Sequence, residues 1–474
     1  MKRPLARAGA VLLLAALTAC DMAPPYHAPD TAPPPAFKES GDWVAAAPGD
    51  QTPRGDWWIV FGEPGLDALE RRVTLDNQSL KAAVARFDQA RADARVAQAD
   101  YYPSLDASGS ATRNGVSRRV ANPLPHNSYN TYSTGLDLSY EIDVWGRVRN
   151  QAEGGKDRAQ AGAGDLATVE LALHAELASD YFILRGYDTE QDILDRTVED
   201  YRKTLELTQA RFGVGYAAKP DVSAAEAQYQ GARTQAAEIR LKRASLEHAI
   251  AILVGEAPAT FSLPVRPLEG KPPAIAPVLP AALLERRPDI AAAERRAAAA
   301  NQDIGLAKTA YYPSFNLNAL FGVQAALPNK LFSAPAETWS FGPQAVVNLF
   351  DGGRRDALTD KARAAYDEAV ANYRQTVLDA YGEVENNLVA LRRLAQEAES
   401  QQAAVTAAED ATRHASNLYT GGLSAYYDVI LAQNVELSAR LSDADIQTRR
   451  MTASVLLIKA LGGGWRQDEL LAGE

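Results

Sequence analysis

Chemically reactive side chains are few in this sequence and lie far apart. Cys20 is the only cysteine among 474 residues, so its thiol can form neither an intramolecular disulfide nor a cysteine-rich metal site. The five histidines are scattered singly, and none stands in a His-Glu-x-x-His spacing. Phosphate-binding loops and Gly-x-Ser-x-Gly motifs are also absent from the sequence. We therefore predict no catalytic residue, no metal site and no enzymatic activity.

Cys20 follows a segment that is typical of an export signal. Basic residues at positions 2, 3 and 7 precede an apolar run over 8–17, which is too short to span a bilayer. The tetrapeptide Leu-Thr-Ala-Cys, which ends at Cys20, resembles the lipobox of bacterial lipoproteins. We expect residues 1–19 to be a signal peptide and Cys20 to carry an N-acyl group and an S-diacylglycerol, with no other cofactor. The alternative is an ordinary secretory signal that ends near a cysteine by chance.

The charge balance excludes one class of partner. The chain has 49 Lys and Arg against 60 Asp and Glu, a net charge of −11, and loss of the signal removes three of the basic residues. Nucleic-acid binding needs a basic face, so we predict no nucleic-acid partner. After the signal no run of about twenty apolar residues occurs, so we predict no transmembrane helix in the mature chain.

Four motifs occur twice in the same order. Tyr-Tyr-Pro-Ser at 101–104 recurs at 311–314, Gly-Arg at 146–147 recurs at 353–354, a glycine-containing turn at 211–215 recurs at 418–422, and an apolar residue followed by glycine at 254–255 recurs at 461–462. The offset is 210 residues for the first pair and 207 for the other three. Such regularity indicates a tandem duplication.

The repeats and the proline-rich stretches suggest the organisation of the chain. The first repeat would occupy 57–257 and the second 282–464, joined by a proline-rich connector at 258–281. A lipid-anchored, proline-rich segment at 20–56 would precede them, and a tail at 465–474 would follow. Both proline-rich segments should be extended, because proline lacks an amide donor and fixes φ.

Each repeat has the pattern of a helix, a β-hairpin, a long helix, a turn and a second helix. The proline-free run over 146–212 would be roughly 100 Å long at about 1.5 Å per residue. In the second repeat, apolar residues from Tyr366 to Leu391 recur at spacings that alternate between three and four, which is typical of a coiled-coil seam. A soluble helical bundle is the alternative, although such bundles rarely need helices of this length.

The β segments alternate between apolar and polar residues. The pattern covers 136–144, 315–323 and 339–349, and a weaker segment rich in Ala, Gly and Ser lies at 105–115. This alternation fits transmembrane strands, although half-buried sheets of soluble proteins show it too. Two hairpins give four strands, too few to close a barrel across a bilayer, and open edges are not tolerated in lipid. If the strands enter a membrane, the chain must oligomerise, and three copies would supply twelve strands.

In this order the motifs resemble the TolC-like outer-membrane efflux proteins, specifically their OprM/NodT lipoprotein branch. The resemblance covers nearly the whole mature chain and includes the lipobox, Trp57-Trp58, the segment from Glu285 to Ile290 and Leu349-Phe350-Asp351-Gly352-Gly353-Arg354. It implies a mixed α+β fold of tandem-duplicated long helical hairpins, with two β-hairpins contributing four strands to a trimeric twelve-stranded transmembrane barrel.

The resemblance also implies a function and partners. The homotrimer would be an outer-membrane channel, lipid-anchored and extending into the periplasm, that receives small compounds through a periplasmic adaptor (membrane fusion protein) from an inner-membrane RND-type pump. Sequence motifs do not name the exported compound. The alternatives are a periplasmic coiled-coil scaffold anchored by lipid alone, which would lack lipid-facing strands, and a lipid-anchored hydrolase, for which no catalytic constellation exists.

By motif match, the working residues lie at the two glycine-containing turns. Gly215 and Gly422 are expected to contact the adaptor, and Asp221, Asp428 and Tyr419 to form the periplasmic gate, with threefold-repeated carboxylates around the pore. Ordinary helix-ending glycines, and a capping role for Asp221 beyond Pro220, are the structural alternatives.

The chain departs from the family pattern at three positions. Ser424 stands where some relatives carry a gate arginine, and Leu431 where a second aspartate often follows. We therefore expect the gate to close through apolar contacts of residues at 423, 426 and 427. Asp21, directly after the lipidated cysteine, can retain a lipoprotein at the inner membrane in enteric bacteria, and we expect a trimeric barrel to override it.

Overall fold

The computed structural model describes residues 21–40, 55–117, 119, 127–273, 275, 280, 284 and 286–465. Cys20, the signal peptide and the tail after Trp465 therefore lie outside the described residues, as does Glu285 of the family motif. The chain forms two compact units. We call Met1–Asp30, Phe87–Gly162 and Ala292–Arg374 the sheet unit, and Thr31–Arg86, Ala163–Ala291 and Gln375–Glu474 the hairpin unit.

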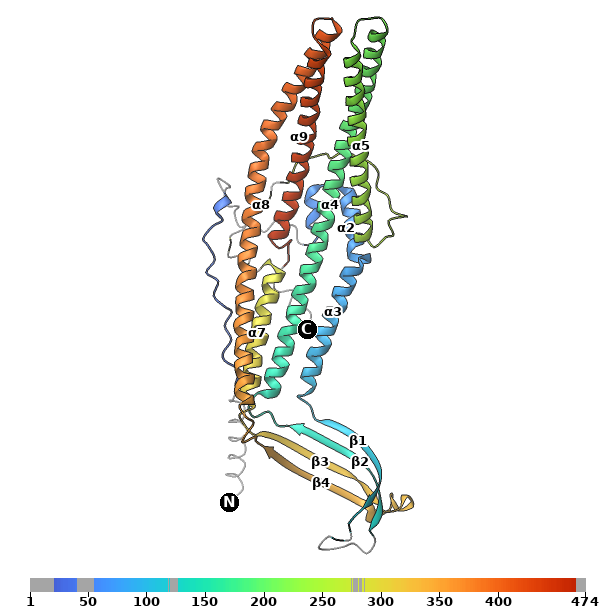
Figure 1. Ribbon diagram of the computed structural model, residues 1–474. Helices are drawn as coiled ribbons and strands as arrows, with labels where there is room; N and C mark the ends of the chain where they lie inside the picture. The colour runs from blue at the N-terminus through green and yellow to red at the C-terminus, as the bar shows by residue number, and fades with distance from the viewer. Residues whose placement is uncertain are drawn as a thin grey trace. The chain divides into compact units, whose positions relative to one another are not determined.

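Seven α-helices of eight or more residues make up most of the described chain (Figure 1). They are α2 (Pro64–Asp76), α3 (Gln78–Ala99), α4 (Arg147–Gly213), α5 (Lys219–Leu253), α7 (Pro288–Thr309), α8 (Arg354–Thr420) and α9 (Tyr426–Ala460). None of the helices built from described residues has an apolar stretch sufficient to span a bilayer.

The duplication predicted from the sequence is present in the helices. Helices α4 and α8 each have 67 residues, and each is followed by a helix of 35 residues, α5 or α9. Neither long helix contains proline, which would remove a backbone hydrogen bond and break the helix. The prediction of two long helical hairpins is confirmed.

The sheet unit contains one antiparallel sheet of four strands. They are β1 (Ser104–Gly115), β2 (Ser128–Glu141), β3 (Ser314–Ala325) and β4 (Glu337–Val346), paired in the order β1-β2-β3-β4. All four predicted strands are present. Strand β2 begins eight residues earlier than expected, and β4 ends at Val346, where its pairing with Ser314 is the last in the register.

The register gives the sheet one apolar and one polar face. On the apolar face Leu136 lies opposite Phe321, which in turn lies opposite Trp339. These side chains are exposed in the single chain, with Trp339 74% accessible. On the polar face Asp106 lies opposite Asp137, whose carboxylate accepts a hydrogen bond from the Ser108 hydroxyl at 2.7 Å. Alternation along the strands therefore places most apolar side chains on one face and most polar side chains on the other, although Leu320 lies on the polar face and Arg113 on the apolar one.

The core of the hairpin unit lies around the N-terminal aromatic motif. Trp57 and Trp58 are buried, together with Leu66 and Val73 of α2 and with Tyr181 and Phe182 of α4. Where α4 and α9 pack closely, Gly186 leaves no room for a side chain, because a Cβ there would lie 2.2 Å from the Thr448 hydroxyl oxygen. Burial of these large apolar side chains holds helices of both hairpins against the aromatic motif and α2.

A buried ion cluster holds the connector against the first hairpin. Asp188, fully buried on α4, accepts hydrogen bonds from Arg243 Nε at 2.6 Å, Arg185 Nη1 at 2.8 Å and the Arg266 backbone N–H at 3.0 Å. The same arginines donate to the carbonyls of 263 and 264. Residues 261–269 form neither helix nor strand, as expected for a proline-rich segment. A buried charge satisfied in this way is costly to disturb, so the connector is firmly attached.

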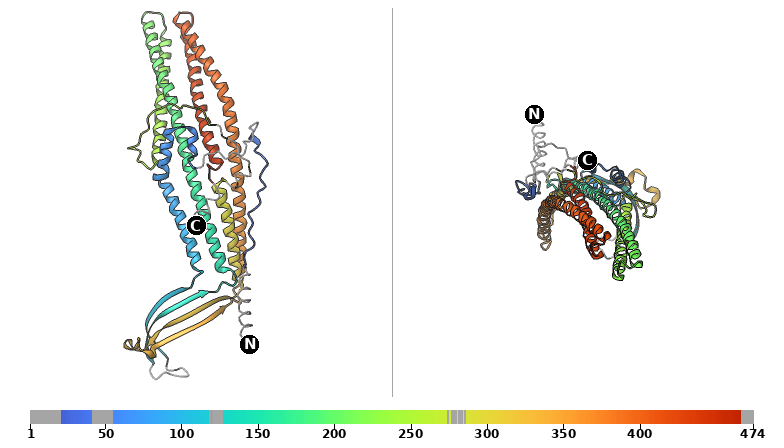
Figure 2. Two further views of the ribbon diagram at one scale, coloured as in Figure 1. Left: turned by 180° about the vertical axis from the view of Figure 1, so that it is seen from behind. Right: turned by 90° about the horizontal axis from the view of Figure 1, so that it is seen from above.

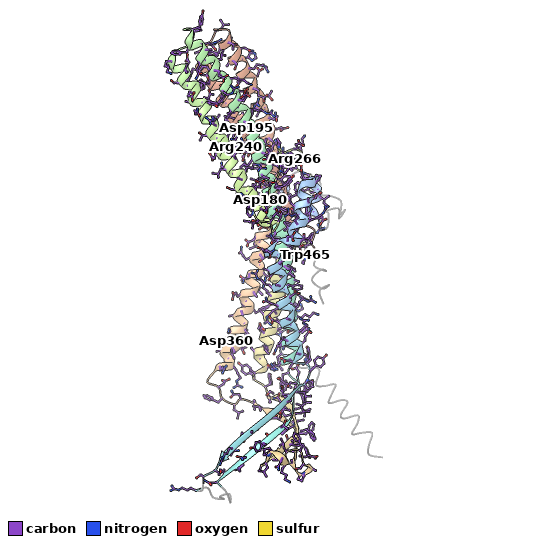
Figure 3. The ribbon with its side chains drawn as sticks, turned by 90° about the vertical axis from the view of Figure 1, so that its right-hand side faces the viewer. Asp180, Asp195, Arg240, Arg266, Asp360 and Trp465 are labelled. Carbon is purple, nitrogen blue, oxygen red and sulfur yellow. The ribbon has the colours of Figure 1, made fainter. Side chains whose placement is uncertain are left out.

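Further along the first hairpin, ion pairs join its two helices at the surface. Arg240 of α5 lies 2.6 Å from Asp195 of α4, and Figure 3 labels both residues. Both side chains are at least half exposed, so this pair stabilises the hairpin only slightly.

Candidate functional site

The two hairpins of the hairpin unit end side by side, and their turns have the same backbone geometry (Figures 1 and 2). In the first turn the N–H of Tyr216 bonds the carbonyl of Arg211 at 2.8 Å, and Gly215 N–H bonds Phe212 at 3.1 Å. In the second, Leu423 N–H bonds Leu418 at 2.8 Å. The bond from Gly422 to Tyr419 completes the second set at 3.0 Å. This pattern is the Schellman motif that ends many helices.

Gly215 and Gly422 are the residues that allow the chain to reverse. Their φ angles are +83° and +74°, in the left-handed region that side chains rarely adopt. Gly213 and Gly421 do not have positive φ angles. Of the four glycines that the sequence offers at the two turns, only Gly215 and Gly422 have the backbone conformation that the reversal requires, and their contact with an adaptor stays a prediction.

Arg211 joins the two turns, and the sequence reasoning missed it. Its guanidinium donates to the carbonyls of Tyr419 at 3.1 Å and Thr420 at 3.0 Å, and its Cζ lies 4.7 Å from the centre of the Tyr419 ring. The last carbonyls of a helix lack helical partners and carry partial negative charge, so a cation is favourable there. Arg211 of the first hairpin thus caps α8 of the second. The sequence carries one signal for this role. Arg211 is charged, whereas the equivalent residue of the second repeat, Leu418, is apolar.

An aromatic pair lies beneath this cap. Tyr419 and Tyr426 are both buried, with ring centres 5.3 Å apart, in a cluster with Leu205, Val222 and Val429. The Tyr426 hydroxyl donates to Gln228 Oε1 at 3.3 Å, and burial raises the pKa of Tyr426 above its ordinary value. We expected residues 423, 426 and 427 to close the gate through apolar contacts. Tyr426 packs between the two hairpins within the chain, and the part of these three residues in a gate stays a prediction.

Leu423 and Tyr427 are exposed at the turn, unlike Tyr426. Leu423 is 78% accessible and Tyr427 64%, so both can meet another molecule or another copy of the chain. The hydroxyl oxygens of Tyr419 and Ser424 are buried and have no hydrogen-bond partner among the described residues. The Ser424 hydroxyl therefore forms no hydrogen-bonded lock at the turn within the described part of the chain.

The two predicted gate aspartates stand at the same position of equivalent helices but differ in their contacts. Asp221 accepts a hydrogen bond from the Ala218 backbone N–H at 3.1 Å. Ala218 is the N-cap residue and has no side-chain acceptor, so Asp221 stabilises the start of α5 from the third helical position. Asp428, the third residue of α9, is exposed. Their place around a pore stays a prediction.

A sheet with one apolar and one polar face, continued by unbroken 67-residue helices into paired hairpins, is the fold of an outer-membrane efflux channel subunit. Comparison with known proteins agrees. The family model described as outer membrane efflux protein matches residues 71–256 and 279–463. The chain belongs to this family, and the predicted fold class, efflux function and outer-membrane location are confirmed.

Individual relatives match over almost the entire chain. The antibiotic efflux pump outer membrane protein ArpC of Pseudomonas putida is 30% identical, over 95% of this chain and 94% of ArpC. The cation efflux system protein CusC of Escherichia coli is 28% identical, over 95% and 97%. The solved structure of the outer-membrane channel OprN has a TM-score of 0.85 at 29% identity, over 94% of this chain and 99% of OprN.

Proposed function

We propose that three copies of the chain close into a passive duct through the outer membrane. The observation that carries this proposal is the exposure of the apolar sheet face, where Phe321, Trp339 and Phe341 are 64–74% accessible in the single chain. Strands β1 and β4 end the sheet, so each presents a row of backbone groups without a partner strand. Pairing of β1 with β4 of the next copy removes these edges, and three sheets give a barrel of twelve strands.

The hairpin turns are then the periplasmic entrance of the duct. Repeated three times, the exposed Leu423, Tyr427 and Asp428 would meet around the axis and narrow it. The turns around Gly215 and Gly422 would receive a periplasmic adaptor, and an inner-membrane pump would supply the energy. In this proposal the chain itself catalyses no reaction.

The cargo follows from the pump rather than from the duct. The names of two relatives refer to an antibiotic and to a cation, although both align with almost the whole of this chain. A wide water-filled duct discriminates poorly, so one fold can serve both. We propose small compounds as the class of cargo, with Cys20 carrying the lipid that anchors the N-terminus.

Conductance in a planar lipid bilayer tests the proposal. The purified protein should migrate on gels as a heat-sensitive trimer and should conduct little current in a bilayer. Asp428→Ala should raise the conductance several-fold, because it removes a charged ring from the narrowest part of the entrance. Asp410→Ala, on an exposed face of α8 away from the turn, is the matched control and should leave conductance unchanged. A monomer that conducts with neither variant would refute the duct and would favour a lipid-anchored scaffold.

A further inference from the structure

A groove lies in the sheet unit between the end of α7 and the start of α8. Its volume is about 560 Å³, and its lining includes Met22, Lys308, Tyr311, Asp356, Asp360 and Arg363. Asp360 is labelled in Figure 3. None of these residues belongs to the hairpin turns, so the groove has no part in the entrance described above. We refer to it as the α7/α8 groove.

The α7/α8 groove lies where the helices meet the exposed sheet. Helix α7 ends at Thr309, and the apolar face of β3 begins at Phe315. Between them the Trp145 ring stacks on Tyr312 with centres 4.7 Å apart, and its indole N–H donates to the Pro313 carbonyl at 2.8 Å. Aromatic rings with a polar end are typical of the boundary between lipid and water. If the sheet spans the membrane as proposed, the groove lies at headgroup depth.

The segment after Cys20 leads along α7 to the same groove. The Tyr26 hydroxyl donates to Glu294 Oε1 and the Asn301 amide donates to the Pro24 carbonyl, both at 2.7 Å. Gly305 lets this segment approach α7, because a Cβ there would lie 2.7 Å from Ala23. Met22 then lines the groove itself. A lipid on Cys20 would therefore enter the bilayer close to the groove, which brings phospholipid headgroups within reach.

The groove is lined by two basic and two acidic side chains, and its basic groups are incompletely paired. The Lys308 ammonium group makes no hydrogen bond or ion pair with another described residue, and the Arg363 guanidinium makes only an exposed pair with Asp360, at 3.4 Å. Asp356 accepts a hydrogen bond from the Tyr311 hydroxyl at 2.5 Å. A simple anion would be repelled by the carboxylates, and a simple cation by the basic groups. A ligand that carries one charge of each sign fits both.

We propose that the α7/α8 groove binds the headgroup of a zwitterionic phospholipid, in which a phosphate is joined to an ammonium group. Lys308 and Arg363 face the phosphate, and Asp356 and Asp360 face the ammonium. Tyr311 and Met22 contact the glycerol and the first carbons of the chains. Such a lipid would fix the depth of the helix ends in the bilayer, in addition to the anchor on Cys20. This proposal rests on the proposed membrane location of the sheet.

Native mass spectrometry of the delipidated full-length protein, titrated with phosphatidylethanolamine, tests the site. The wild type should bind one lipid per chain. The double variant Lys308→Ala with Arg363→Ala should bind about thirtyfold more weakly, since each basic side chain at a membrane surface contributes roughly fivefold. The matched control is Arg354→Ala with Lys361→Ala, which removes the same charge from exposed positions of α8. Equal binding by the double variant and its control would overturn the proposal.

Headgroup chemistry gives a second readout that general damage to the fold would not produce. Diacylglycerol should not bind, because it lacks both the phosphate and the ammonium group, and inorganic phosphate should not compete, because it lacks the ammonium group. Asp356→Asn with Asp360→Asn should weaken phosphatidylethanolamine binding and leave phosphatidylglycerol binding unchanged or stronger. Equal preference in wild type and variant would contradict the assigned roles of the carboxylates.

Two further experiments test whether the chain's own lipid anchor occupies the groove and whether the groove and the duct can fail independently. A Cys20→Ser protein exported without lipid should still bind phosphatidylethanolamine. If it gained binding only of diacylglycerol, the groove would be the site of the chain's own anchor and the proposal would be wrong. Trimer migration and conductance should be the same in all groove variants. If the wild type bound no phosphatidylethanolamine but still migrated as a trimer and conducted, only this inference would be overturned. If the wild type neither migrated as a trimer nor conducted, the duct itself would be refuted.

Discussion

The two hairpin turns share one backbone and differ in what their side chains do. In the first, Lys219 lies over the exposed ring of Phe212 at 5.9 Å. In the second, the equivalent residues are Tyr426 and Tyr419, both buried and in ring contact. Arg211 of the first turn reaches over to cap the second. The two turns thus share one backbone geometry, but their side chains have diverged. The first turn supplies Arg211, and the second supplies the carbonyls that Arg211 binds.

The largest effect should follow from removal of the buried ring. Tyr426→Ala empties a site among Leu205, Val222 and Val429, which should lower the free energy of unfolding by about 3–5 kcal/mol. Lys219→Ala, at the equivalent exposed position, should change it by less than about 0.5 kcal/mol. Thermal unfolding followed by far-UV circular dichroism measures both. Similar losses in the two variants would show that the turns are not differentiated in this way.

A side chain at the positive-φ glycine should destabilise both turns equally, because the two turns share one backbone geometry. Gly215→Val and Gly422→Val each force a branched residue into a left-handed conformation, which should cost roughly 1–2 kcal/mol. Gly213→Ala is the control, since it has no positive φ and no atom within 4 Å of a new Cβ. Alanine there should be neutral or slightly stabilising in the same unfolding measurement. A large difference between the two valine variants would show that one turn tolerates strain that the other does not.

Arg211 should matter more than its counterpart Leu418. Arg211→Ala removes two hydrogen bonds to the α8 carbonyls and should cost about 1–2 kcal/mol, because the site is partly exposed. It should also raise the conductance of the reconstituted channel by freeing the hairpins from each other. Arg211→Lys keeps the charge without the forked geometry and should recover only part of the loss. Leu418→Ala serves as the comparison, and an equal response to both alanine variants would argue against the cap.

The smallest effect concerns the aspartates. Asp221→Asn weakens the hydrogen bond from Ala218 and the favourable charge at the start of α5, at a cost of about 0.5–1 kcal/mol. Asp428→Asn should cost about 0.3 kcal/mol, because Asp428 is exposed and only the helix dipole acts on it. The midpoint of thermal unfolding distinguishes the two. A larger loss for Asp428 in the trimer would indicate contacts between copies of the chain.

Sequence patterns predicted the features that depend on local periodicity. The absence of proline over 146–212, the alternation of the strands and the glycines at 215 and 422 each determine backbone geometry directly, and each prediction agrees with the structure. Even the weak strand at 105–115 is present as β1, because its pairing with β2 compensates for its small side chains.

Contacts between hairpins could not be predicted in the same way. Helical spacing shows which residues share a face, but it does not show which face meets the neighbouring hairpin. Arg211 was missed for this reason, and so was the packing of Tyr426 inside the chain, while its part in a gate stays a prediction. Asp221 was considered as an N-cap, whereas it acts from the third position of the helix. The contacts of Arg211 and Tyr426 join residues about 200 positions apart, whereas the capping role of Asp221 depends on where the helix begins.

The facing carboxylates of the sheet have a consequence for ion permeation. Asp106 and Asp137 lie side by side on the polar face of β1 and β2, and within the four strands that face contains no lysine or arginine. In the proposed arrangement this face lines the lumen, so three copies would surround it with fixed negative charge. Counterions would concentrate there, and a potassium chloride gradient should set up a reversal potential with the sign of cation preference. Neutralising both positions with asparagine should weaken that permselectivity while the channel stays open, and the Asp428 ring at the entrance should account for the remainder.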